Sequence, residues 1–103
     1  MANNLYEKVF NNSGGASEQV KIIDDCNTGR VQLSLYGPVG SATIHIQKQL
    51  ILRDGTTSAI TDVETYNDEI DLEMAVGKGN NLYIEVTGMD AVTNLVCKVS
   101  ELN

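Results

Sequence analysis

The chain has 103 residues, 42% of them hydrophobic and 20% charged, which suits one globular domain rather than a disordered segment. Fourteen acidic residues against seven basic ones give a formal net charge of −7, which repels a phosphate backbone and argues against nucleic-acid binding. The chain has no apolar run of about 18 residues, so the sequence predicts no transmembrane helix and no membrane partner.

The first 17 residues differ in character from the rest. Asparagine, serine and glycine frame four apolar residues, Leu5, Tyr6, Val9 and Phe10, whose spacing fits either one helical turn or an extended arm. The Ser-Gly-Gly-Ala-Ser stretch at 13–17 reads as a hinge. We therefore predict a flexible N-terminal arm and hinge (1–17). Its apolar residues either plug one end of the chain's own core, dock on another subunit or stay disordered.

The rest of the chain (18–103) is dominated by a period of two, in which apolar and polar residues alternate. This period places every apolar side chain on one face of a strand and does not fit an amphipathic helix. Seven strands are predicted, at 18–23, 30–36, 41–52, 58–65, 69–76, 82–87 and 92–100.

The connections between these strands carry turn residues. Asp54 and Gly55 stand at the centre of a predicted hairpin at 53–57. Lys48 interrupts the alternation of the third strand, which predicts a bulge near Lys48 or Gln49, or an edge position there. No segment of ten or more residues between Val20 and Leu102 has helical periodicity. We expect an all-β chain forming a single antiparallel β-sandwich, jelly-roll or immunoglobulin-like, with an N-terminal arm.

Few residues suggest a metal site or a catalytic centre. Cys26 and Cys97 belong to no CxxC motif, and His45 is the only histidine, so a zinc site is not expected. We interpret the cysteines as buried thiols, although a disulfide between neighbouring strands stays open. His45 alternates with Ile44 and Ile46, which predicts a surface histidine with no nucleophile beside it. We therefore expect no cofactor, no metal and no catalytic residue.

Two groups of acidic residues are candidates for calcium sites. Glu69, Asp71 and Glu73 share one face of a predicted strand, which is more typical of a solvated face than of a site that curls around an ion. A turn with Asp24, Asp25 and Asn27 has suitable ligands but lacks the spacing of a calcium loop. Turn chemistry explains the second group adequately.

Three tyrosines are the basis for an alternative function, the binding of carbohydrate. Tyr36, Tyr66 and Tyr83 are available as parts of a sugar-stacking face, although the chain has no tryptophan. A carbohydrate-binding or adhesion module is therefore the alternative function. Neither glycine-containing loop, at 37–40 or 77–79, has the spacing of a phosphate-binding loop.

The order of strands and turns from Val31 to Val99 resembles a pattern in small structural proteins of tailed bacteriophages. Its pieces include ATIHIQ at 42–47, the DGTT hairpin at 54–57 and LYIEVTG at 82–88, together with the segments at 31–37, 62–65 and 69–76. The resemblance covers about two thirds of the chain. It rests on strand and turn patterns, so it transfers no functional residues.

This resemblance implies a virion component: a head decoration (cement) protein, a head-fibre base or a tail accessory protein. Such proteins are non-enzymatic and act as symmetric oligomers. The implied partners are the major capsid protein or other virion subunits, with a homo-oligomer, a trimer favoured, made in the host cytoplasm. The first ten residues lack the pattern of a secretory signal, so the chain is either kept in a cytoplasm or has lost a signal. Within this hypothesis, Leu5, Tyr6, Val9 and Phe10 of the arm are the expected protein-interaction residues.

Overall fold

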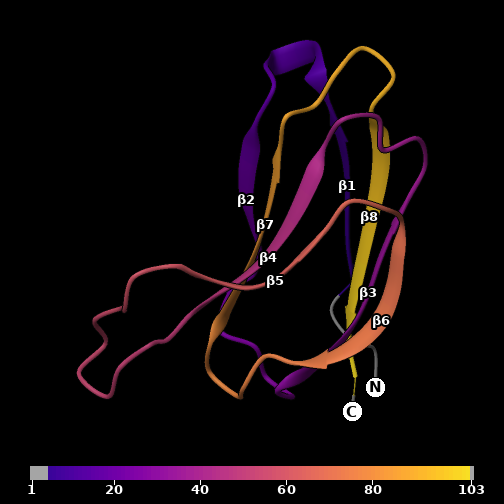
Figure 1. Ribbon diagram of the computed structural model, residues 1–103. Helices are drawn as coiled ribbons and strands as arrows, with labels where there is room; N and C mark the ends of the chain where they lie inside the picture. The colour runs from indigo at the N-terminus through magenta and orange to yellow at the C-terminus, as the bar shows by residue number, and fades with distance from the viewer. Residues whose placement is uncertain (1–4, 103) are drawn as a thin grey trace.

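A computed structural model describes residues 5–102 of the chain (Figure 1). Within this range the chain forms eight strands, one short 3-10 turn (Asn12–Gly14) and no α-helix, so no helix there could span a membrane. The strands are β1 (Leu5–Asn11), β2 (Glu18–Ile23), β3 (Arg30–Tyr36), β4 (Thr43–Gln49), β5 (Thr61–Tyr66), β6 (Ile70–Ala75), β7 (Asn81–Thr87) and β8 (Asn94–Glu101). The all-β prediction is confirmed, and all seven predicted strands are present.

The strands form two four-stranded sheets. The first sheet has the order β1-β8-β3-β6 and the second has the order β2-β7-β4-β5. Every pairing is antiparallel. In Figure 1 β1, β8, β3 and β6 lie on one side, and β2, β7 and β4 lie on the other. The arrangement is a sandwich with one edge at β1 and β2 and the other at β5 and β6.

The core lies between the sheets and is built by the alternation seen in the sequence. Val31, Leu33 and Leu35 of β3 are fully buried, while the residues between them face outward and are partly exposed. On β7, Leu82, Ile84 and Val86 follow the same pattern. Each such side chain contributes roughly 1.5–3 kcal/mol when it is taken out of water. The period of two therefore sets which face of each sheet becomes the interior.

The prediction of a flexible arm is wrong for residues 5–11. These residues form β1, which pairs with β8 along its whole length, from Leu5 opposite Ser100 to Asn11 opposite Asn94. Phe10 is fully buried in this chain's own core, and Tyr6 packs against that core. Val9 faces the other way and is 45% exposed. Residues 1–4 and the side chain of Leu5 lie outside the described part of the chain.

Lys8 interrupts the alternation of apolar and polar residues in β1, so the sequence pattern does not indicate a strand there. Lys8 lies opposite Cys97, in the row of β1 that faces inward, between Tyr6 and Phe10. The edge position lets its amine reach Glu18 at 3.0 Å and lie 5.4 Å from the centre of the Phe10 ring. A polar residue at an inward position breaks the alternation, so the spacing of the apolar residues suggested a helical turn or an arm. Residues 5–11 belong to the sandwich, and the predicted boundary at residue 17 falls in the connection from β1 to β2.

The predicted bulge near Lys48 or Gln49 is absent from β4, and β4 is not an edge strand; the irregularity lies on its neighbour β5. The pairing of β4 with β5 shifts register between Ile46 and Gln47, where Val63 is the extra residue on β5. The pairing of β4 with β7 runs through the same positions without a shift. The bulge therefore belongs to the edge strand β5, as is common at sheet edges.

Both cysteines are free and buried, which confirms the prediction of buried thiols. Burial raises the pKa of Cys97 to about 12. Burial and a hydrogen bond with Glu101 also raise the pKa of Cys26. Because the thiolate is the reactive form, these two side chains stay unreactive at neutral pH.

Candidate functional site

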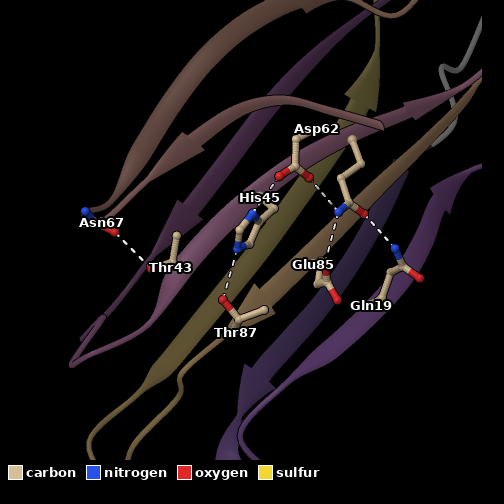
Figure 2. Close-up of polar contacts among 8 residues, drawn as sticks. Gln19, Thr43, His45, Asp62, Asn67, Glu85 and Thr87 are labelled. Carbon is tan, nitrogen blue, oxygen red and sulfur yellow. Dashed lines mark hydrogen bonds and ion pairs between the residues drawn. The ribbon is translucent and has the colours of Figure 1, made fainter. Parts of the chain in front are cut away.

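A network of polar side chains covers the outer face of the second sheet (Figure 2). Its members come from four neighbouring strands, because the alternation that turns Ile44, Ile46 and Ile84 inward turns the residues between them outward. The members are Gln19 of β2, His45 and Gln47 of β4, Asp62 of β5, and Glu85 and Thr87 of β7.

Gln47 is the centre of this network and is only 6% exposed. Its side-chain amide donates hydrogen bonds to Asp62 Oδ1 at 2.8 Å and to Glu85 Oε1 at 3.1 Å. Its carbonyl oxygen accepts from Gln19 Nε2 at 2.8 Å. One amide thus links all four strands of the sheet, and no described buried side-chain N or O atom lacks a partner.

His45 lies between an acid and a hydroxyl. Its Nδ1 is 3.1 Å from Asp62 Oδ2, and its Nε2 is 3.0 Å from Thr87 Oγ1. The connectivity is that of a hydroxyl, a base and an orienting carboxylate, but such a chain catalyses acyl transfer only beside an oxyanion hole and a substrate cleft. Here the three side chains join neighbouring strands on the outer face of a sheet (Figure 2). We therefore interpret them as a structural link between β4, β5 and β7.

The network makes stability depend on pH through Asp62. Hydrogen bonds from Gln47 and then His45 lower the pKa of this carboxyl below its ordinary value of 3.8. A depressed pKa in the folded state stabilises the fold above pH 3.8, and this contribution disappears as the pH falls through the lowered value.

We expect Asp62→Asn to remove part of the acid sensitivity. Thermal unfolding followed by circular dichroism from about pH 5 to about pH 2 should show a smaller fall in Tm for the variant than for the wild type. Asp68→Asn is the matched control, because Asp68 is exposed and bonds only the N–H of Glu69 among the contacts of the described chain. Equal pH dependence of all three proteins would contradict the assignment.

The predicted histidine and acidic residues lie on separate faces. His45 lies on the outer face of the second sheet, as predicted, and is half-buried there with two polar partners that the sequence did not indicate. Asp71 accepts hydrogen bonds from Gln32 and Ser34, and Glu73 pairs with Arg30 at 3.4 Å. The row of acids on β6 is thus a polar outer face of the first sheet, as predicted.

The acidic turn at 24–27 holds the end of the sandwich together. Asp24 pairs with Lys21, and Asn81 accepts a hydrogen bond from the backbone of Asp25. Among the residues described, no group of three or more histidine, cysteine, aspartate or glutamate side chains is arranged to hold a metal ion.

The second candidate site is an apolar groove at the β5 and β6 edge, hereafter the edge groove. It has a volume of about 400 Å³ and is lined by Ile46, Val63, Glu64, Tyr66, Leu72, Glu73, Met74 and Ala75. Leu72 and Met74 pack against the core yet remain partly exposed, unlike the corresponding residues of the central strands. The groove exists because β5 places Glu64, opposite Ile46, where a large apolar residue would close the gap.

The opposite edge has a hollow of similar volume, about 390 Å³, but polar residues and glycines line most of it, with Val9 as the only apolar side chain. There β1 and β2 follow one another through the short turn at 12–17, and the ion pair of Lys8 with Glu18 bridges them. Phe10 fills the space behind this ion pair. The two edges therefore differ in character: the hollow at β1 and β2 is polar, and the groove at β5 and β6 is apolar.

A hairpin at residues 50–58, hereafter the projecting hairpin, extends away from both sheets between β4 and β5 (Figure 1). Leu50 and Leu52 are each 48% exposed on it. The predicted turn is present, with Gly55 donating to the carbonyl of Leu52 at 2.9 Å and Ile51 bridged to Thr57. The Asp54-Gly55 pair predicts this turn, whereas no feature of the sequence indicates how far the hairpin projects.

The three tyrosines considered for sugar stacking lie apart. Tyr66 lines the edge groove, with its hydroxyl bonded to Glu64. Tyr83 lies on the second sheet, where its hydroxyl donates to Gln49 at 3.3 Å. Tyr36 is 48% exposed at the end of β3 in the first sheet. They therefore do not form one common platform.

No protein-family model, no curated protein and no solved structure matches this chain.

Proposed function

We propose that the chain is a non-enzymatic structural protein of a tailed-bacteriophage virion, decorating or stabilising the capsid through protein–protein contacts. The observation that carries this proposal is the apolar surface left uncovered at two places, the edge groove and the projecting hairpin. Single exposed apolar residues are ordinary, but grouped ones rimmed by polar groups are typical of interaction sites.

Both places group their apolar residues. In the edge groove, Leu72 and Met74 lie two residues apart on β6 and therefore share a face. On the projecting hairpin Leu50 and Leu52 have the same spacing in an extended segment. Covering a half-exposed leucine completely recovers on the order of 1 kcal/mol. Contacts of this size are weak singly and become stable when symmetry repeats them.

The strand pairing supports the jelly-roll form of the sandwich within this proposal. The first strand pairs with the eighth, the second with the seventh, the third with the sixth and the fourth with the fifth. This is the pairing of one long hairpin folded over on itself, which is how a jelly roll is built. Jelly rolls serve in viral capsid proteins and also in lectins.

The charge of the chain fits an outward-facing position. A formal net charge of −7 disfavours contact with packaged nucleic acid and suits the solvent side of a shell. The partners in this proposal are the major capsid protein or other virion subunits, and copies of the chain itself, with a trimer favoured. The chain would then be made in the host cytoplasm and end in the virion.

The direct test is to look for the chain on particles. Gradient-purified particles of the phage that encodes it are analysed by mass spectrometry and labelled with gold-tagged antibody against the chain. The proposal expects the chain in the particles, with label at the head surface. Absence of the chain from intact particles that contain their other structural proteins would overturn it.

A carbohydrate-binding module is the second candidate, favoured by the position of Tyr66. This ring lines the edge groove beside Glu64 and Glu73, so an aromatic face and carboxylate acceptors meet in one hollow. A glycan array with the wild type and Tyr66→Ala separates the two functions. Binding that Tyr66→Ala abolishes supports the lectin-like function, and no binding by the wild type removes it.

A further inference from the structure

The projecting hairpin is an ordered element with an uncovered apolar side. Its backbone is held by hydrogen bonds from Leu52 N–H to the Thr56 carbonyl at 2.7 Å and from Ser58 N–H to the Leu50 carbonyl at 2.9 Å. At its tip the Asp54 carboxylate accepts from both the N–H and the hydroxyl of Thr56. A hairpin ordered before binding loses little entropy when it docks, which suits it to be inserted into a partner.

The tip presents one cation. Arg53 is exposed and makes no ion pair with any residue in the described range, whereas the neighbouring Asp54 carboxylate is turned into the hairpin by Thr56. The surface available to a partner therefore consists of the side chains of Leu50 and Leu52 and the guanidinium of Arg53.

The edge groove offers the complementary surface. Its floor is apolar, and its charged lining residues, Glu64 and Glu73, are both acidic and exposed. Glu73 pairs with Arg30 at 3.4 Å, and Glu64 accepts a hydrogen bond from the Tyr66 hydroxyl, so Glu64 is the carboxylate without a cationic partner among the described residues. The groove follows residues 72–75 of β6, and the hairpin presents residues 50–53. At roughly 3.3 Å per residue each segment spans about 13 Å. The two surfaces are complementary in polarity, and Glu64 supplies the charge opposite Arg53.

We propose that the projecting hairpin of one copy docks into the edge groove of the next copy, with Leu50 and Leu52 on Leu72 and Met74 and with Arg53 beside Glu64 and Glu73. This inference rests on the proposed function, because it names the partner that covers the groove. The contact joins two different surfaces, so repetition closes into a ring when the rotation between copies allows it.

The overall negative charge does not prevent this contact at physiological salt. Screening there limits electrostatic interactions between exposed charges to about 8 Å. The net charge of −7 is spread over the whole molecule, while Arg53 and the two glutamates would lie at the interface itself. The local attraction therefore decides the orientation of docking.

Disulfide trapping between two differently labelled chains tests the contact. Leu52→Cys in one chain and Val63→Cys in a second are mixed and oxidised, and the rate of covalent dimer formation is followed on non-reducing gels. Both positions are exposed, so neither variant is expected to unfold, and the native Cys26 and Cys97 are buried. Val92→Cys, 62% exposed at another part of the surface, replaces Val63→Cys in the control mixture.

The proposal expects the Leu52→Cys and Val63→Cys mixture to cross-link at least about tenfold faster than the control mixture. A charge exchange gives an independent readout by sedimentation. Arg53→Glu and Glu64→Arg should each weaken self-association about fivefold, and the two together in one chain should restore it.

Equal cross-linking rates in the two mixtures would overturn the inference. If self-association of the wild type then persists, or if the chain is found on particles, the proposed function stands and another surface carries the assembly. If the cross-linking rates are equal and Val63→Cys is nevertheless protected from alkylation on particles, a different virion protein fills the groove, which also overturns the inference. A chain that neither self-associates nor occurs on particles would overturn both.

Discussion

Replacing Phe10 by alanine is expected to lower the free energy of unfolding by about 3–5 kcal/mol. The Phe10 ring is fully buried between the two sheets, opposite Leu95 of β8. Truncation removes its transfer free energy and leaves a cavity that the surrounding strands close only in part. Because a domain of this size is stable by about 5–15 kcal/mol, the loss is a large fraction of the total.

Chemical denaturation of Phe10→Ala beside Val9→Ala measures this effect with a matched control. Val9 is the adjacent residue on the same strand but faces outward, and its truncation should change stability by no more than about 0.5 kcal/mol. Equal and small effects of the two substitutions would mean that residues 5–11 are an arm and not a strand of the sandwich.

The burial of Phe10 makes a deletion of the N-terminal residues unsuitable as a test of assembly. Removing residues 1–12 would take away β1, the edge strand that covers β8. Loss of assembly after that deletion would follow from damage to the sandwich and would not report on docking. Substitutions on the projecting hairpin separate folding from assembly, because Leu50 and Leu52 are already half exposed.

Replacing Gly37 by alanine should destabilise the fold almost as strongly. Gly37 is the first residue after β3 and has φ of +125°, and a Cβ built there would lie 2.1 Å from the backbone carbonyl oxygen of Asn94. The positive φ costs a residue other than glycine about 1–2 kcal/mol. Relieving the clash requires moving the start of β8, which costs about another 1–3 kcal/mol.

Gly55→Ala is the control for the conformational part of this effect. Gly55 has a positive φ of +88° but nothing within 4 Å of a built Cβ. Alanine at this position therefore strains the backbone but makes no steric clash. Thermal unfolding should place the Tm of Gly37→Ala clearly below that of Gly55→Ala. If the two variants unfold at the same temperature, the close approach of Gly37 to β8 is not present in solution.

The strands were predictable where alternation is unbroken. Residues 30–36 were predicted with the bounds that β3 has in the structure, because Val31, Leu33 and Leu35 alternate with polar residues throughout. The first strand was missed because Lys8 occupies an inward position that only an edge strand with a nearby Glu18 can tolerate. That pairing joins two strands across the edge of the sandwich, and a local pattern carries no information about it.

The polar network around Gln47 could not be predicted, because it depends on the pairing register of β4 with β5 and β7, which the sequence does not reveal. Gln47 and Asp62 are 15 positions apart and meet only because β5 has an extra residue at Val63. Thr87 reaches His45 from β7, which lies on the other side of β4. The edge groove likewise joins strands of different sheets. The turn of the hairpin was readable from Asp54 and Gly55, whereas the exposure of Leu50 and Leu52 was not.

Sedimentation velocity of the purified wild-type chain over a wide concentration range tests most directly whether these uncovered apolar surfaces drive assembly. We expect a discrete oligomer whose fraction rises with concentration, at about three times the monomer mass of 11.2 kDa if the ring is a trimer. The double variant Leu50→Glu/Leu52→Glu should not form this oligomer. A wild type that stays monomeric at every concentration, or a double variant that assembles as well as the wild type, would contradict this expectation.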